Sequence, residues 1–286
     1  MGLPVKNPSS KMASSETRPI KTLDEVWSWK PRDVKKSWME IDNLKPRSAV
    51  QRITKCELNN GNAYDFEVLP NETSRPKVLV CHDMKGGYIE DRFINGCYDL
   101  REEPYRFVHW SLIDTFVYFS HHLITIPPRG WIQAGHRNGV EILGTIITES
   151  DEGKKICDEV LKTRDNVDEF VNICCKIAVC HNFEGWLLNI ENQLDKEQVP
   201  NLLYLVEKLT KEIHDAIGVG AKVIWYDSVT HEGKLNWQNA LNEKNAKFFD
   251  SCDGIYLNYG WRIKPDVNDL DETVHFLEKR YGNVDR

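Results

Sequence analysis

The residues with the clearest chemical potential are an amide and a carboxylic acid two positions apart, Asn189 and Glu191, at the end of the apolar run GWLLNIE. Alternate side chains of a β-strand point to the same face, so these two would point the same way. A carboxylic acid partly desolvated by aromatic rings has a raised pKa and can donate a proton near neutrality. The amide beside it could orient a substrate group. Spacing alone leaves a second interpretation open, in which both residues cap a strand and face solvent.

A second pair of polar candidates, His82 and Asp83, precedes the turn Gly86-Gly87-Tyr88. Loops at the end of a strand often carry binding residues, so this pair could bind substrate hydroxyl groups. The alternative is that both residues only cap the turn.

Other histidines do not form a metal-binding pattern. His121 and His122 are adjacent and would point to opposite faces of a strand, which argues against a shared metal. His136 and Arg137 come shortly before an apolar run and are expected to close a turn at the opposite rim. The sequence contains no HExxH, P-loop or Rossmann glycine pattern, so we expect no metal and no other cofactor.

From residue 76 onward, short apolar or β-branched runs alternate with longer polar or amphipathic stretches, a rhythm typical of βα units around a parallel sheet. Several runs become polar only at their carboxyl ends, as in a barrel with its chemistry at one rim. The sequence therefore predicts an α/β fold, a (β/α)₈ TIM-type barrel, with Asn189 and Glu191 at that rim. The six recognisable strands are residues 78–83, 115–120, 140–148, 185–191, 221–227 and 254–259.

Four helices are expected between and after these strands. Apolar residues recur at three- and four-residue spacing over 202–217, and Gly218 would cap this helix. A helix over about 168–179 would bury the vicinal pair Cys174 and Cys175 as small apolar residues. The other two helices are expected near 237–249 and 269–280.

The strand count bears on domain organisation. A closed barrel of this type has eight strands, and six are recognisable before residue 286. We expect residues 1–21, rich in Ser, Pro and Lys, to be a disordered leader, and residues 22–286 to be one catalytic barrel domain truncated before strands seven and eight. The alternative places two strands before residue 76, where only 63–69 is a weak candidate.

Composition narrows the class of partner. The chain of 286 residues carries a formal net charge of -7, which argues against nucleic acid or an anionic membrane as a partner. It contains no apolar run long enough to cross a membrane and no secretory signal, and its 8 cysteines include no CxxC pair. We expect a cytosolic protein with free thiols and no obligate protein partner.

Several motifs in register resemble glycoside hydrolase family 85, the endo-β-N-acetylglucosaminidases. The run FEGWLLNIEN at 183–192 resembles the catalytic strand of the family, and LVCHDMKGGY at 79–88 resembles its first strand and loop. Residues 117–149, 224–230, 235–242 and 252–261 resemble its other strands and loops in the same order. The resemblance covers about residues 76–261 and is greatest for eukaryotic cytosolic members.

The resemblance implies hydrolysis of the β-1,4 bond between the two core N-acetylglucosamines of an N-glycan, with retention of configuration and assistance from the sugar's own 2-acetamido group. Glu191 would be the general acid and base, and Asn189 would hold the acetamido group. Tyr226 matches a family tyrosine near the reacting sugar, although a half-buried core tyrosine is the alternative. Trp237 and Trp261 match aromatic positions around the sugar.

Asp227, the residue after Tyr226, is not expected to take part in the chemistry. Asp227 would face away from Tyr226 along the strand and is interpreted as structural. A non-catalytic glycan-binding barrel or an inactive truncated form is the main alternative to the hydrolase. A chitinase-like enzyme is disfavoured because the chain lacks a DxxDxDxE run. The predicted partners are N-glycan oligosaccharides and glycoproteins, with a role in cytosolic free-oligosaccharide and glycoprotein processing.

Overall fold

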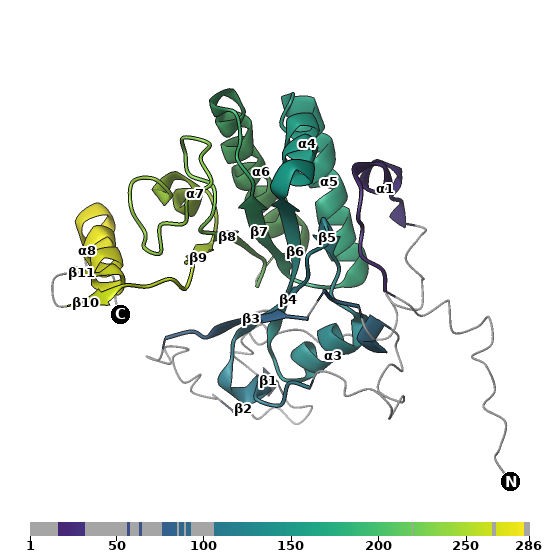
Figure 1. Ribbon diagram of the computed structural model, residues 1–286. Coiled ribbons are helices and arrows are strands. Elements are labelled where there is room, and N and C mark those ends of the chain that lie inside the picture. Colours follow the sequence, from purple (N-terminus) through teal and green to yellow (C-terminus); the bar gives the residue numbers. More distant parts are fainter. Residues whose placement is uncertain are drawn as a thin grey trace, which may run out of the picture.

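One curled parallel sheet with helices on its outer side forms the body of the protein (Figure 1). The computed structural model describes residues 17–31, 56–57, 63–64, 76–84, 86–88, 90–92, 106–218, 220–264 and 267–282. The parallel strands of the sheet are β3 (Leu79–Asp83), β4 (Thr115–Phe119), β6 (Glu141–Glu149), β7 (Gly185–Glu191), β8 (Lys222–Tyr226) and β9 (Gly254–Tyr256).

These strands lie in chain order, and each is parallel to its neighbour. A short strand, β5 (Ile124–Thr125), pairs with β6 in the antiparallel sense. The six predicted strands and the barrel-type α/β fold are thus confirmed, with the sheet curled into a half-barrel (Figure 1). The last strand is shorter than the predicted 254–259.

The two faces of the sheet bury different apolar clusters. Alternate residues along each strand, such as Leu143 on β6, Leu187 on β7 and Ile224 on β8, form a small cluster on the inner face of the curl. The residues between them, such as Trp186 and Trp225, belong to the larger cluster under the helices. The inner face therefore points toward the position of a barrel axis, and every strand residue can be assigned to one face by parity.

Longer helices cover the outer face. The apolar stripe and the Gly218 cap predicted for 202–217 are present in the helix that occupies this segment, and Gly218 has a φ of 83°. Cys174 and Cys175 are buried in the apolar cluster, as predicted. The helices are α1 (Leu23–Ser28), α3 (Arg129–Arg137), α4 (Ser150–Val160), α5 (Arg164–His181), α6 (Val199–Ile217), α7 (Ala246–Asp250) and α8 (Asp269–Tyr281).

The helix predicted over 237–249 is wrong for most of its length. Only its last residues are helical, in α7, while residues 236–245 form an irregular segment. The physical reason is the backbone of Asn239: its φ of 58° is left-handed, which a right-handed helix cannot contain, and its N–H is held by the carboxylate of Asp227.

The amino end of the sheet is held by buried polar pairs. Glu141 Oε2 accepts a hydrogen bond from Thr115 Oγ1 at 2.7 Å and lies 2.8 Å from Lys222 Nζ. On the outer side, His136 at the end of α3 lies 3.1 Å from Glu184 Oε2, which also accepts the N–H of Ile142. His136 therefore lies at the rim opposite the strand ends, as predicted, although it belongs to a helix that the sequence did not indicate.

Smaller elements lie apart from the main sheet. One antiparallel pair joins β1 (Cys56–Glu57) to β2 (Ala63–Tyr64), so residues 63–64 of the weak strand candidate do not pair with the main sheet. The rest of that candidate lies outside the described residues. A second pair joins β10 (Ile263–Lys264) to β11 (Val267–Asn268), and the short 3₁₀ helices are η4 (Glu90–Arg92), η6 (Trp110–Leu112) and η7 (Lys196–Gln198).

The end of the expected leader is part of the fold. Ile20 exchanges backbone hydrogen bonds with Ile124 of β5 and is buried, and Thr17 is also buried. Residues 1–16 lie outside the described residues, so the expectation of a disordered leader stays untested for them.

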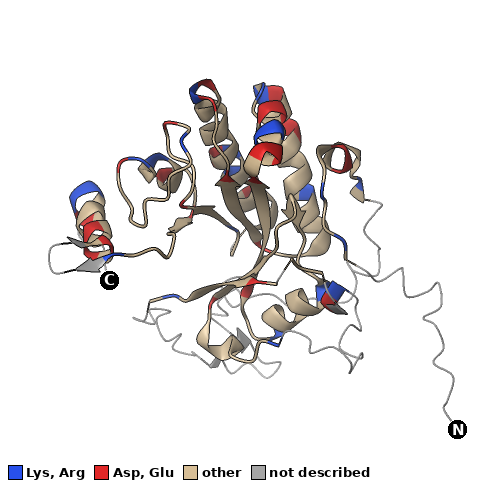
Figure 2. Ribbon diagram, in the orientation of Figure 1, with Lys and Arg blue, Asp and Glu red and all other residues tan. Residues whose placement is uncertain are grey.

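Charged residues lie mainly on the helices and connecting segments, while the middle of the main sheet is largely uncharged (Figure 2). Among the described residues, no helix combines the length and the apolar character that a membrane span requires.

Candidate active site

Glu191 is the last residue of β7 and lies on the inner face at the carboxyl edge of the sheet. The strand forms because GWLLNI is apolar except for Asn189 and is buried on both faces. Its first residue, Gly185, has a φ of +151°, and a Cβ there would collide with the carbonyl oxygen of Lys222 on β8. This close approach fixes β7 against β8 and with it the position of Glu191.

Asn189 lies on the same face as Glu191, as its parity with Leu187 predicts, and is only 2% exposed. Its side-chain oxygen is buried and has no hydrogen-bond partner among the described residues. Buried polar atoms are almost always paired in proteins, so an unpaired amide oxygen beside a half-buried acid is a feature that a ligand could satisfy.

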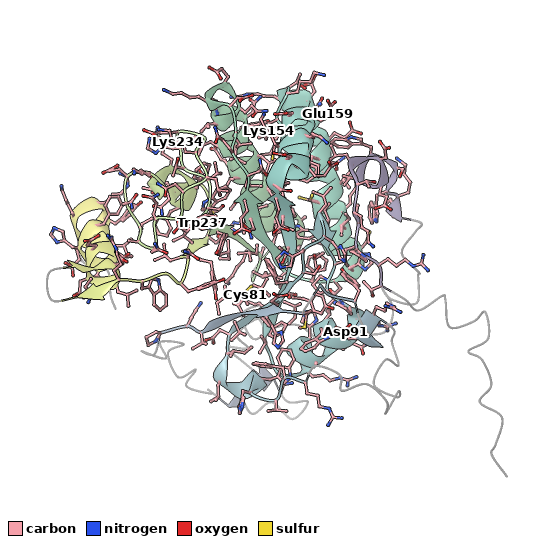
Figure 3. The ribbon with its side chains drawn as sticks, viewed as in Figure 1. Cys81, Asp91, Lys154, Glu159, Lys234 and Trp237 are labelled. Atoms are coloured by element: carbon pink, nitrogen blue, oxygen red, sulfur yellow. The ribbon has the colours of Figure 1, made fainter. Side chains whose placement is uncertain are left out.

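Trp237 is a hydrogen-bond partner of Glu191. It lies in the segment between β8 and α7 (Figure 3), and its indole Nε1 donates a hydrogen bond to Glu191 Oε1 at 3.3 Å. The ring is 40% exposed, which leaves an aromatic face available beside the carboxyl group. Flat aromatic faces and a carboxyl group together are suited to binding the apolar face of a sugar ring while a proton is transferred.

The surroundings of Glu191 favour its protonated form. Burial raises the pKa of Glu191 above its usual value, and the negative charge of Glu149 raises it further. The hydrogen bonds from Trp237 and Asn189 and the proximity of His121 lower the same pKa, but burial is the largest influence. A carboxyl group of this kind can act as a general acid near neutral pH.

Tyr226 ends β8 on the inner face, next to β7. Its hydroxyl donates a hydrogen bond to Asn258 Oδ1 at 3.1 Å. Burial raises the pKa of Tyr226, and the negative charge of Glu191 also contributes to this rise. The structure therefore brings Glu191, Asn189, Tyr226 and Trp237 together at one edge of the sheet.

The sequence analysis missed a second polar group beside Glu191. Glu149 ends β6 and is the register partner of Glu191 across the strand pair. His121, which follows β4, places Nδ1 3.1 Å from both carboxylate oxygens of Glu149, and its Nε2 lies 3.8 Å from Asp83 Oδ2. The sequence could have indicated Glu149, because it ends a predicted strand and lies an even number of residues after Leu143, so both side chains point to the same face.

Two predicted binding residues are separated from this group. His82 lies on the outer face of β3, where its ring contacts those of Phe116 and Trp131, away from the face that carries Glu191. Asp83, one residue later, is on the inner face and near His121. Trp261 is 47% exposed, and within the described residues no ring contact or hydrogen bond connects it to Glu191.

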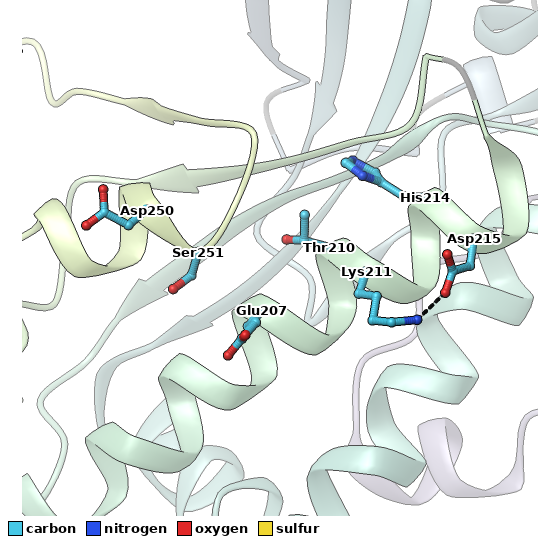
Figure 4. A pocket seen from close by; sticks show the side chains of 7 residues that line it. All are labelled: Glu207, Thr210, Lys211, His214, Asp215, Asp250 and Ser251. Atoms are coloured by element: carbon cyan, nitrogen blue, oxygen red, sulfur yellow. Dashed lines mark hydrogen bonds and ion pairs between the residues drawn. The ribbon is translucent and has the colours of Figure 1, made fainter. Parts of the chain in front are cut away.

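A groove on the outer side of the sheet is a separate feature (Figure 4). It contains none of the predicted site residues, and Lys211 forms an ion pair with Asp215 there. The described residues contain no group of three or more His, Cys, Asp or Glu side chains that could hold a metal ion. The residues that line the groove are Glu207, Thr210, Lys211, His214, Asp215, Asp250 and Ser251.

Comparison with known proteins assigns the chain to a class. The model of the family described as "Glycosyl hydrolase family 85" matches residues 88–283. The chain therefore belongs to glycosyl hydrolase family 85, in agreement with the resemblance noted from the sequence motifs.

Particular relatives support this assignment. The chain is 50% identical over 196 residues to "Cytosolic endo-beta-N-acetylglucosaminidase 2" of Arabidopsis thaliana, covering 68% of this chain and 27% of that protein. It is 42% identical over 250 residues to the human "Cytosolic endo-beta-N-acetylglucosaminidase", covering 83% of this chain and 33% of that protein. The chain thus spans a third or less of the length of these relatives.

A solved structure supports the fold. The glycoside hydrolase domain of Endo-D from Streptococcus pneumoniae R6 superposes with a TM-score of 0.64 at 20% sequence identity, covering 94% of this chain and 41% of that chain. This similarity extends over almost the whole chain and agrees with a partial barrel.

Proposed function

We propose that this chain carries the catalytic group of an endo-β-N-acetylglucosaminidase that hydrolyses the β-1,4 bond between the two core N-acetylglucosamines of N-glycans. The observation that carries the proposal is the half-buried Glu191, whose pKa is raised by burial, on the same strand face as the buried amide of Asn189. Membership of glycosyl hydrolase family 85 and the similarity to proteins named endo-beta-N-acetylglucosaminidases support the choice of substrate.

The proposed mechanism is retaining and substrate-assisted. In the first step the carbonyl oxygen of the sugar's 2-acetamido group attacks C1, the bond from C1 to the leaving oxygen breaks, and Glu191 gives its proton to that oxygen. The product of this step is an oxazolinium-type intermediate. In the second step water attacks C1, Glu191 takes up a proton from the water, and the acetamido group is restored with retention of configuration.

Asn189 and Tyr226 would assist the reacting sugar. The unpaired side-chain oxygen of Asn189 could accept the N–H of the acetamido group, which would orient the acetamido oxygen toward C1. The Tyr226 hydroxyl, on the neighbouring strand end, could donate a hydrogen bond to the intermediate. The absence of a second carboxylate nucleophile at position 189 agrees with the use of the substrate's own group.

Trp237, Trp261 and Asp83 would bind the rest of the glycan. Trp237 has an exposed ring face next to Glu191, and Asp83 extends the polar row formed by His121 and Glu149. Trp261 is exposed enough to stack on a sugar ring. His82 is left out of this group because it packs on the outer face.

The proposed substrates are N-glycan oligosaccharides and glycoproteins. The relatives are named as cytosolic proteins, and we place the proposed reaction in the cytosol, in the processing of free oligosaccharides and glycoproteins. The proposed unit for this function is the barrel domain that begins near residue 22.

Digestion of a high-mannose glycopeptide, followed by mass spectrometry, tests the proposal. The unchanged chain should leave a single N-acetylglucosamine on the peptide, and Glu191→Gln should reduce the rate by about 10²–10⁴, as expected for loss of a general acid. Glu197→Gln, which changes an exposed glutamate in η7, is the matched control and should cleave normally. A folded, unchanged chain that binds the glycan without cleaving it would favour the glycan-binding alternative.

A further inference from the structure

Asp227, the residue after β8, is a buried carboxylate that binds two segments of the chain. It is 1% exposed. Its Oδ2 accepts the backbone N–H groups of Gln238 at 2.9 Å and Asn239 at 2.7 Å, and its Oδ1 accepts Asn245 Nδ2 at 3.1 Å. The described residues contain no Lys or Arg in ion-pair contact with Asp227, so amide N–H groups provide its stabilisation.

The hydrogen bonds of Asp227 hold the backbone next to Trp237. The N–H of Gln238 belongs to the peptide group that also contains the carbonyl of Trp237, so Asp227 fixes the backbone on which the indole is carried. The Trp237 ring is 40% exposed, so only part of its surface packs against the rest of the chain. Its hydrogen bond to Glu191 at 3.3 Å therefore depends on the position of this backbone.

Asp227 is also connected to Tyr226 through hydrogen bonds. Asn239 has a φ of 58°, and its side-chain oxygen accepts Asn258 Nδ2 at 2.6 Å and the N–H of Gly260 at 3.2 Å. The oxygen of the same Asn258 amide accepts the Tyr226 hydroxyl. A continuous series of hydrogen bonds thus runs from Asp227 through Asn239 and Asn258 to Tyr226.

We propose that Asp227 is a positioning residue of the proposed active site, where it sets the placement of Trp237 and Tyr226 relative to Glu191 through the segment 236–245. This inference rests on the proposed function for its effect on the reaction. It goes beyond a structural role, because Trp237 and Tyr226, the two side chains that Asp227 would place, both interact with Glu191.

Asp227→Asn is the informative change. A carboxylate accepts hydrogen bonds at both oxygens, whereas an amide turns one of these atoms into a donor that would face an N–H group. We expect kcat to fall by about 10²-fold, because small misplacements of catalytic groups slow a reaction by about this factor. KM should change much less. Asp253→Asn is the matched control, because Asp253 accepts the Val223 N–H of the same strand at its other end and should leave kcat unchanged.

A spectroscopic readout separates this inference from the proposed function. In the full chain labelled with ¹⁵N-tryptophan, the indole resonance of Trp237, assigned with Trp237→Phe, should shift as Glu191 titrates. Asp227→Asn should abolish this shift, and Asp253→Asn should retain it. An unchanged Trp237 titration in folded Asp227→Asn would overturn the inference, even if the chain has no glycosidase activity.

A second variant covers the case in which Asp227→Asn does not fold. Asn239→Gly keeps the backbone N–H that Asp227 accepts and tolerates the positive φ, but removes the acceptor of Asn258. It should lower kcat through Tyr226 while the Trp237 resonance still titrates. Normal kcat in an otherwise active chain would contradict the proposed connection to Tyr226.

Discussion

Glu149 and Glu191 are register partners at the ends of the neighbouring parallel strands β6 and β7. Two carboxyl groups placed side by side in this way disfavour simultaneous ionisation. The His121 imidazole holds Glu149 through both carboxylate oxygens, while the indole of Trp237 donates to Glu191. The two acids thus have different partners, and burial is the largest influence that raises the pKa of Glu191.

Removing the charge of Glu149 should shift the pH dependence of activity downward. The negative charge of Glu149 raises the pKa of Glu191, so Glu149→Gln should lower that pKa. Because the general acid must be protonated, the basic limb of the kcat/KM profile should move to lower pH. Glu152→Gln, on the exposed side of α4, is the control. A basic limb that stays in place in Glu149→Gln would contradict this electrostatic relationship.

Removing the indole N–H should have the opposite effect. The hydrogen bond from Trp237 lowers the pKa of Glu191, so Trp237→Phe should raise it while keeping an aromatic face in the site. We expect the basic limb of kcat/KM to move to higher pH. The pair of variants is measured in the same buffers, and shifts in the same direction would show that the two partners do not act on Glu191 as described.

The close approach of β7 and β8 at Gly185 should make this position intolerant of a side chain. Gly185→Ala would force a Cβ into the carbonyl oxygen of Lys222 at an unfavourable φ, and should lower the free energy of unfolding by about 1–3 kcal/mol. A Cβ at Gly130 in α3 would meet no atom within 4 Å, so Gly130→Ala should instead raise the free energy of unfolding by about 0.5–1 kcal/mol. Urea denaturation of both variants measures their free energies of unfolding, and equal midpoints would contradict the predicted intolerance at Gly185.

The strands were predictable because their signals are local. The run that forms β7 is apolar except for Asn189 and Glu191, and its period of two correctly placed these two residues on one face. The same rule, applied to adjacent residues, would have shown that His82 and Asp83 cannot both face the site. The structure has only Asp83 on the inner face.

The rest of the site depends on contacts between residues distant in sequence, and no local pattern reports them. His121 and Glu149 are 28 positions apart, and Asp227 binds backbone groups 11 and 12 positions later. The segment 237–245 has apolar spacing that resembles a helix, but the backbone of Asn239, whose N–H is bound by Asp227, has a left-handed φ of 58° that a right-handed helix cannot contain. Tertiary contacts therefore override local preference there.

The hydrogen-bond series from Asp227 to Tyr226 also has a consequence for how the sequence can change over time. Asn258 Nδ2 donates to the side-chain oxygen of Asn239, and Asn258 Oδ1 accepts the Tyr226 hydroxyl, so replacing Asn239 leaves the Asn258 amide without its acceptor. Substitutions at these positions should be non-additive. During divergence of the family they should therefore change together, as one inherited unit, rather than one at a time.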